Sequence, residues 1–289
     1  MLRIETIKFI NESQILELNK NQIESFPLIG GEAANMINTQ VWNQHGNTHV
    51  AAYMESFEGE LIFAIFTEKM TNLEIRLERQ RIIEICNPLN GIIEMQVKLS
   101  DGSIYSRDIT FISAPFFPIG FDNRNNKWQK VQLQYEANNP FWYSSIEIIE
   151  TFKSVESLFD FPFSMSIAAP VMFGTMIPAN TATNDGQVEA PVTIKIQGAC
   201  INPSIVNETT GEFIRFKNLT MVAEDTLEID TTFGQKKVLL NGENVFNKLD
   251  FNSSFFNLVL GDNTIEFTDD TGSTAATIYF IYRNLYITI

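Results

Sequence analysis

The chain has 289 residues, of which 44% are hydrophobic, and it carries a formal net charge of −15 at pH 7. This length allows two ordinary domains, and this apolar content argues against a disordered chain. The negative charge argues against nucleic acid or anionic lipid as the principal partner, because both would repel it.

The sequence also bears on the compartment. The N-terminal stretch MLRIETIKF alternates polar and apolar residues and lacks the apolar core of a signal peptide. No apolar run approaches the roughly 18 residues that a membrane-spanning helix needs. The only two cysteines, Cys86 and Cys200, favour a reduced compartment and are expected to be small core residues. We therefore expect a soluble protein that is synthesised in a cytoplasm.

One segment of the N-terminal half, TNLEIRLERQRIIEIC, predicts a helix over about 71–86. A capping-box sequence begins at Thr71, and Pro88 is a stop signal. Leu73 and Leu77 share one face of this helix, but the later isoleucines drift off that face. The predicted amphipathicity is therefore imperfect.

Most of the remaining sequence alternates with the period of a β-strand. In VQLQYEA, the residues Val131, Leu133 and Tyr135 fall on one face and two glutamines fall on the other. From about residue 190 to the end, short strands alternate with turn pairs such as Asn241-Gly242 and Gly261-Asp262. That spacing predicts an antiparallel sandwich or barrel.

Two segments near the middle of the chain are less regular. Residues 144–153, SSIEIIETFK, fit a helix or a strand, and we favour the strand. Residues 154–184 are apolar but are interrupted by Pro162, Pro170 and Pro178. We therefore predict a loop that packs on the sandwich.

Candidate catalytic groups are few. His45 and His49 have the spacing of a helical zinc-binding pair, but Gly46 and Asn47 disfavour a helix and the glutamate of the metalloprotease motif is absent. A polar loop or a strand edge is the favoured interpretation. No nucleophile elbow, phosphate-binding loop or dinucleotide fingerprint occurs. We predict no catalytic residue, no metal site and no cofactor.

The stretch EANNPFWYS places three aromatic residues directly after a proline at mid-chain. Pro140 lacks an N–H and is expected to stop the preceding strand. Phe141, Trp142 and Tyr143 could stack on a sugar or form the seam between two domains. The pattern by itself leaves both interpretations open.

Three stretches together resemble the distal tail proteins of long-tailed, siphovirus-type bacteriophages and prophages. They are VQLQYEANNPFWYS, the segment that begins NDGQVEAPVTIKIQG, and the segment from DTLEID to LVLGDNTIEF. The likeness includes Asn184-x-Gly186, Asn241-Gly242 and Gly261-x-Asn263, and it is strongest over residues 128–289. Leu260 departs from the proline that the family typically has there, which affects only a turn.

The resemblance implies a mainly β fold. An N-terminal β-rich α+β domain, residues 1–143, would carry the helix and form a hexameric ring. A galectin-like antiparallel β-sandwich would follow, over residues 144–289. Pro140, Phe141, Trp142 and Tyr143 would then lie at the inter-domain seam, which is the interpretation that we favour.

The resemblance also implies a function without catalysis. The protein would be a structural component of the virion tail tip, the hub of the baseplate, made in the bacterial host cytoplasm. Its ring would join the tail tube to the host-adsorption apparatus and leave a channel for DNA, which would pass without specific binding. The implied partners are other copies of the chain, the major tail (tube) protein and tail-associated or receptor-binding proteins, with no membrane.

The alternative is a carbohydrate-binding module that recognises a host cell-surface saccharide. Against it, Trp42, Trp128 and Trp142 all precede the sandwich, which contains no tryptophan. A cell-wall-degrading enzyme is a third interpretation, and it lacks a recognisable set of catalytic residues.

Overall fold

The computed structural model describes residues 3–11, 14–26, 33–66, 72–120, 122–124, 128–153, 180–270 and 276–289. The chain forms two compact units, and strands dominate both. The N-terminal unit comprises Met1–Ser145 and Tyr286–Ile289, and the C-terminal unit comprises Ile146–Leu285. The predicted mainly β fold is therefore confirmed. The last four residues lie in the first unit, although the sequence placed them in the second domain.

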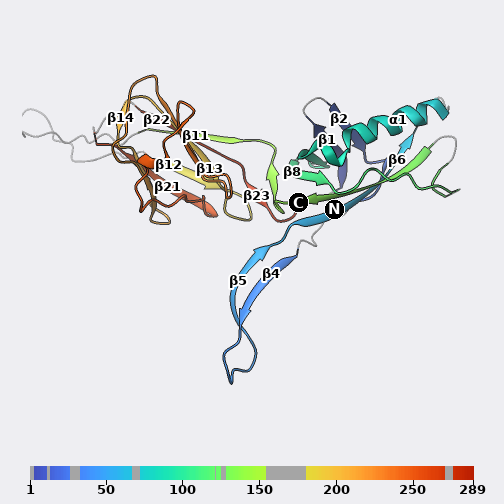
Figure 1. Cartoon of the computed structure of the whole chain (residues 1–289), viewed down its shortest axis with the longest axis horizontal. Coiled ribbons are helices and arrows are strands. Elements are labelled where there is room, and N and C mark those ends of the chain that lie inside the picture. The colour runs from blue at the N-terminus through green and yellow to red at the C-terminus, as the bar shows by residue number, and fades with distance from the viewer. Residues whose placement is uncertain are drawn as a thin grey trace, which may run out of the picture. The chain divides into compact units, whose positions relative to one another are not determined.

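The N-terminal unit is built on an antiparallel sheet (Figure 1). Within the described part of the chain its strand order is β2 (Gln14–Asn19), β1 (Ile4–Asn11), β7 (Ile93–Leu99), β8 (Ile104–Phe111), β9 (Trp128–Ala137), β6 (Phe57–Phe66) and β3 (Ile23–Ser25). Beside this path, β10 (Trp142–Ser144) pairs with β8 and with β23 (Leu285–Tyr286). A separate hairpin consists of β4 (Ala34–Thr39) and β5 (Thr48–Met54).

Period-two alternation places one face of these strands in the core. On β9, Val131, Leu133 and Tyr135 are fully buried, as predicted, while Gln134 between them is exposed. Cross-strand packing joins the same face of other strands, because the rings of Phe9 and Phe111 lie 5.5 Å apart. Burying these side chains supplies the main stabilising contribution to the unit.

The predicted helix forms as α1 (Asn72–Ile85), which is followed by the short 3₁₀ helix η1 (Pro88–Asn90). Ile75, Ile82 and Ile85 are the buried residues of α1, whereas Leu73 and Leu77 are exposed. The imperfect amphipathicity of the sequence therefore has a simple cause. The helix has one apolar face towards the core and a second apolar stripe towards solvent.

The C-terminal unit contains two larger antiparallel sheets around one apolar core, which confirms the predicted sandwich. One sheet has the order β11 (Ile148–Lys153), β22 (Thr277–Tyr282), β13 (Val192–Gln197), β18 (Thr226–Asp230), β19 (Lys237–Leu240) and β20 (Glu243–Asn244). The other has the order β12 (Asn180–Asn184), β21 (Gly261–Thr268), β15 (Ser204–Asn207) and β16 (Glu212–Arg215). Smaller elements are β14 (Cys200–Ile201), β17 (Thr220–Met221) and the 3₁₀ helix η2 (Phe246–Lys248).

Two buried asparagines explain motifs on which the resemblance rests. The Asn263 side-chain amide donates to the carbonyls of Ala182, Val259 and Gly261, and its oxygen accepts from Asn207. This side chain therefore ties β12, β15 and β21 together, and its polar atoms are satisfied as burial requires.

The Asn184-x-Gly186 motif also has a structural cause. Asn184 donates from its amide to the carbonyls of Val188 and Leu258 and accepts from the backbone N–H of Gly186. A Cβ atom at Gly186 would lie 2.6 Å from the backbone oxygen of Leu285, so no other residue fits there without a shift. These motifs are thus fixed by packing inside the C-terminal unit.

The structure changes two details of the sequence prediction. Most of the loop predicted over 154–184 lies outside the described residues, but Asn180–Asn184 form β12 instead of a loop. Gly261-Asp262, predicted as a turn, begins β21, because these residues pair with Asn184 and Thr183. The favoured strand assignment for 144–153 holds for β11.

Among the described residues, no helix is long and apolar enough to cross a membrane.

Candidate assembly interface

The β4–β5 hairpin differs from the sheet of the N-terminal unit because neither of its strands has a buried face. Figure 1 shows it leading away from the sheet of that unit. All six residues of β4 are exposed, and β5 has no fully buried residue. A backbone hydrogen bond of 3.0 Å from Glu55 to the Ala33 carbonyl continues the ladder at its base. The hairpin is therefore an ordered arm without a core of its own.

One face of this arm is apolar near its base. Ala34 pairs with Met54, and Met36 pairs with Ala52, so these four side chains lie on the same side of the two strands. Met36 is 58% exposed. Methionine adapts its shape to irregular partner surfaces. We call these four residues the hairpin face.

The arm is also uncharged. Residues 33–54 contain no Asp, Glu, Lys or Arg, in a chain whose net charge is −15. Solvated hairpins normally carry charged side chains that keep them from pairing with other chains. An uncharged arm with exposed apolar residues is instead typical of a surface that another protein covers.

The hairpin tip is held by local hydrogen bonds and presents a tryptophan. Gln44 accepts from the Val41 N–H at 3.1 Å and donates to the Thr48 hydroxyl at 2.8 Å. Between them, Trp42 is 96% exposed. A rigid, fully solvated tryptophan is the residue type that most often dominates binding energy at protein interfaces.

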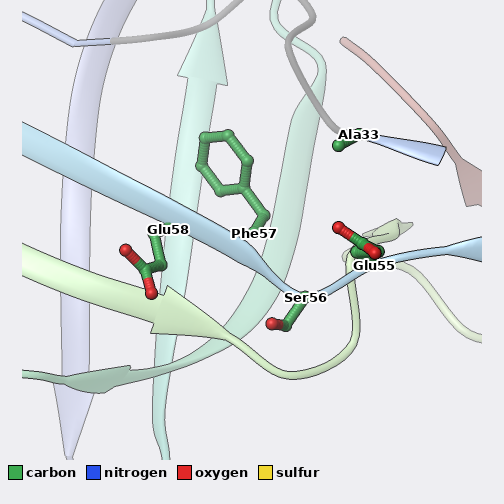
Figure 2. Close-up of a pocket in the computed structure, with 5 residues that line it drawn as sticks. All are labelled: Ala33, Glu55, Ser56, Phe57 and Glu58. Carbon is green, nitrogen blue, oxygen red and sulfur yellow. The ribbon is translucent and has the colours of Figure 1, made fainter. Parts of the chain in front are cut away.

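An open hollow of about 590 Å³ lies at the base of the hairpin, lined by Ala33, Glu55, Ser56, Phe57 and Glu58. Figure 2 shows the two glutamates on either side of Phe57. Both carboxylates belong to exposed residues, whereas Phe57 is half-buried and packs into the unit. The hollow therefore has two carboxylates at its rim and lies beside the apolar residues of the arm.

The mid-chain aromatic stretch has a different environment. Trp142 is 2% exposed and belongs to the core of the N-terminal unit. The guanidinium of the buried Arg107 lies 4.2 Å from the Trp142 ring centroid and 5.1 Å from that of Phe57. Arg107 also donates a hydrogen bond to the Pro140 carbonyl. This cation–π cluster fixes the chain after β9.

The other residues of that stretch also have partners in the N-terminal unit. The Tyr143 hydroxyl donates to the Asp108 carboxylate at 2.8 Å, and the Phe141 N–H donates to the Asn139 side chain at 3.2 Å. Pro140 is buried and Phe141 is half-buried. The structure thus brings the four predicted seam residues together. Their role at an inter-domain seam stays a prediction.

The histidines and cysteines show no arrangement for chemistry. His45 lies at the hairpin tip and His49 on β5, and both are exposed. In the described residues, no group of three or more His, Cys, Asp or Glu side chains could hold a metal ion. Burial raises the pKa of the Cys86 thiol, and burial together with Asp269 and Asp225 raises that of Cys200 to about 12. Both thiols therefore stay protonated and unreactive at neutral pH.

Comparison with known proteins identifies the C-terminal unit. Residues 185–285 match the family described as siphovirus-type tail component, C-terminal domain. This segment is thus similar to the C-terminal domain of a siphovirus-type tail component. The matched residues include β13, β21 and the Gly261-x-Asn263 motif. The resemblance to phage distal tail proteins is therefore confirmed.

One solved structure extends the likeness to the fold of nearly the whole chain. The SPP1 Dit (gp 19.1) protein, described as a paradigm of the hub adsorption apparatus in phages that infect Gram-positive bacteria, is 12% identical with a TM-score of 0.64. The similarity covers 96% of this chain and 98% of that chain. A structure of the phage P2 baseplate with Ca is 10% identical with a TM-score of 0.48, over 98% of this chain and 99% of that chain. No curated protein sequence matches this chain.

Sequence reasoning missed the hairpin as a candidate interface. It noted the polar stretch around His45 and His49 but not the arm that carries them, because strands without a core face lack the usual burial pattern. A signal was nevertheless present, since residues 33–54 contain no ionic side chain.

Proposed function

We propose that this tail component forms the ring of a phage or prophage tail tip through its N-terminal unit. Six copies would close into a ring that joins the tail tube to the host-adsorption apparatus and leaves a channel for DNA. The observation that carries the proposal is the exposed, uncharged β4–β5 hairpin. An arm of this kind gains stability when a neighbouring subunit covers it.

Ring closure requires that one patch of each subunit meets a different patch of the next subunit. A projecting arm suits this geometry, because it reaches beyond the surface of its own unit. Figure 1 shows the arm clear of the sheet that forms the core of the unit. The arm therefore offers the first of the two patches that a closed ring needs.

The polar face of the N-terminal sheet supports a channel for DNA. Glu94 on β7 lies opposite Asp108 on β8, and Glu58 on β6 lies opposite Glu136 on β9. These carboxylates fall on the side of the sheet that faces away from the core. Like charges opposite one another weaken a sheet, so their presence favours a role outside stability. The same face also carries Lys8 and Lys98, which form ion pairs with Glu17 and Glu5. The carboxylates that have no ion pair within the described residues would repel DNA phosphates and let the genome slide without binding.

The test is the oligomeric state of the full-length chain and of a shortened variant. In the variant, an Asn-Gly turn replaces residues 36–52, which keeps the base of the hairpin. Light scattering after size exclusion and electron microscopy should show six-subunit rings for the full chain and folded monomers for the variant. Circular dichroism should match between the two. A full-length chain that stays monomeric at the highest soluble concentration would overturn the proposal, as would rings of the shortened variant.

A second candidate function is saccharide binding by the C-terminal unit. Phe233 and Phe251 in that unit are 93% and 101% exposed, and aromatic rings of this kind can stack on sugar rings. Calorimetry with host-envelope saccharide should then show binding that Phe233→Ala or Phe251→Ala reduces. Absence of saccharide binding would instead favour a protein partner for these two aromatic rings.

A further inference from the structure

Helix α1 carries the second exposed apolar surface of the N-terminal unit. Leu73 is 64% exposed and Leu77 is 54% exposed. They are four residues apart, so they lie on one face, one turn above the other. The opposite face of α1 is buried through Ile82 and Ile85. The two leucines, which we call the helix stripe, thus form a short apolar row that the same copy does not cover.

The helix stripe matches the hairpin face in spacing. One helical turn of four residues advances about 6 Å along the axis. Two residues of a β-strand advance about 6.7 Å. Leu73 and Leu77 are therefore spaced like Ala34 and Met36 on β4, so a helix laid along the strand brings apolar side chains together at both positions.

The charges beside these two surfaces are complementary. Arg76 on α1 directly precedes Leu77 and is exposed, and no hydrogen bond or ion pair of Arg76 occurs within the described part of the chain. Glu55 directly follows Met54 and lies on the hollow at the base of the hairpin (Figure 2). The residues described also provide no ion pair for the Glu55 carboxylate. Arg76 beside the helix stripe and Glu55 beside the hairpin face are thus of opposite sign, and Glu58 adds a second carboxylate to the hollow.

The two surfaces cannot be joined within one copy as it stands. Figure 1 shows α1 lying against the N-terminal sheet, whereas the β4–β5 hairpin leads away from that sheet. We infer that the hairpin face of one copy packs along the helix stripe of the next copy, with Glu55 paired to Arg76. This inference rests on the proposed ring, for which it supplies the second patch.

The direct test is a disulfide between the two surfaces in the full-length chain. With Glu55 paired to Arg76, Leu77 lies beside Ala34 and Met54, and Leu73 lies opposite Met36. A Met36→Cys, Leu73→Cys double variant, oxidised after assembly, should therefore give a ladder of crosslinked species up to six subunits on a non-reducing gel. The natural Cys86 and Cys200 are buried and should not contribute. Met36→Cys with Ile92→Cys is the matched control, because Ile92 is exposed in the same unit but lies off the helix stripe. The control should give no ladder.

The outcomes separate this contact from the ring itself. Rings without a Met36–Leu73 ladder would overturn the helix contact and leave the ring intact. A ladder that stops at two subunits would support the contact and overturn the ring, because two copies would then exchange arms reciprocally. Absence of any assembly by wild type would overturn both.

A charge exchange tests the predicted ion pair. Arg76→Glu and Glu55→Arg should each weaken assembly about tenfold, and the double variant should recover most of that loss. Both sites are exposed, so the fold of the single variants should be intact in circular dichroism. Single variants that weaken assembly without recovery in the double variant would overturn the pairing of Glu55 with Arg76.

Discussion

Two of the three tryptophans of the N-terminal unit lie in opposite environments. Trp142 sits in a dense aromatic stretch and is buried beneath the Arg107 guanidinium, whereas Trp42 stands in a polar sequence and is almost fully exposed. The aromatic-rich stretch around Trp142 is conspicuous in the sequence but is buried, whereas the polar stretch around Trp42 is exposed. Aromatic density is therefore a poor indicator of exposure. The absence of charge along residues 33–54 is the more informative signal.

The largest effect on stability is expected at Trp142. Trp142→Ala should lower the free energy of unfolding by about 3–5 kcal/mol, because it leaves a cavity in the core and removes the ring beneath Arg107. Chemical denaturation monitored by circular dichroism measures this loss. A variant of unchanged stability that loses saccharide binding would instead support the sugar-stacking interpretation.

The control for Trp142 is its neighbour Tyr143. Tyr143→Phe removes only the hydroxyl that donates to Asp108 and keeps the ring, so the expected loss is about 1 kcal/mol. Equal losses at both positions would mean that the stretch is not anchored mainly by the Trp142 ring.

At Trp42 we expect the reverse pattern. Trp42→Ala should change the free energy of unfolding by no more than about 0.5 kcal/mol, because the side chain is solvated. It should weaken assembly by about 2 kcal/mol, or roughly 30-fold in dissociation constant, if the ring buries it as an anchor. Phe251→Ala is the matched control, an equally exposed aromatic residue outside the hairpin. Assembly that responds equally to both variants would contradict a special role of the hairpin tip.

A smaller effect than at Trp142 is expected at Arg107. Arg107→Lys keeps the positive charge but loses the planar guanidinium that lies over Phe57 and Trp142, so stability should fall by about 1–2 kcal/mol. Thermal unfolding measures the change, and the exposed Arg124→Lys serves as a control with no expected effect. No loss at Arg107 would show that packing rather than the cation–π contact holds Trp142.

The sequence predicts elements well where one side of an element is buried. The alternation at Val131, Leu133 and Tyr135 predicted a core-facing strand, and the capping box and Pro88 predicted the helix close to its observed ends. Leu73 and Leu77 show the limit of this approach. Their spacing indicates a common helix face, but only tertiary packing decides whether that face meets the core or solvent.

The candidate interface was harder to predict from the sequence, for a related reason. Side chains that will contact another subunit look like core residues in a sequence, and a strand such as β4 lacks the polar face that marks a half-buried strand. The resemblance supplied the tail-protein assignment, whereas the hairpin had to come from the fold. The motif residues Asn184 and Asn263 were visible in the sequence, but their role as buried cross-strand ties was not.

The return of Tyr286–Ile289 to the N-terminal unit makes the C-terminal unit an insertion in the chain. The strand that leaves, β10, pairs with the strand that returns, β23, so the two points of attachment are adjacent. A segment with neighbouring ends can be lost, enlarged or exchanged for another in a single recombination event, while its host keeps the same strands. The C-terminal unit thus has the topology of a replaceable cassette. A chain that joins Ser145 to Tyr286 through a short turn is the natural form in which to study the N-terminal unit alone.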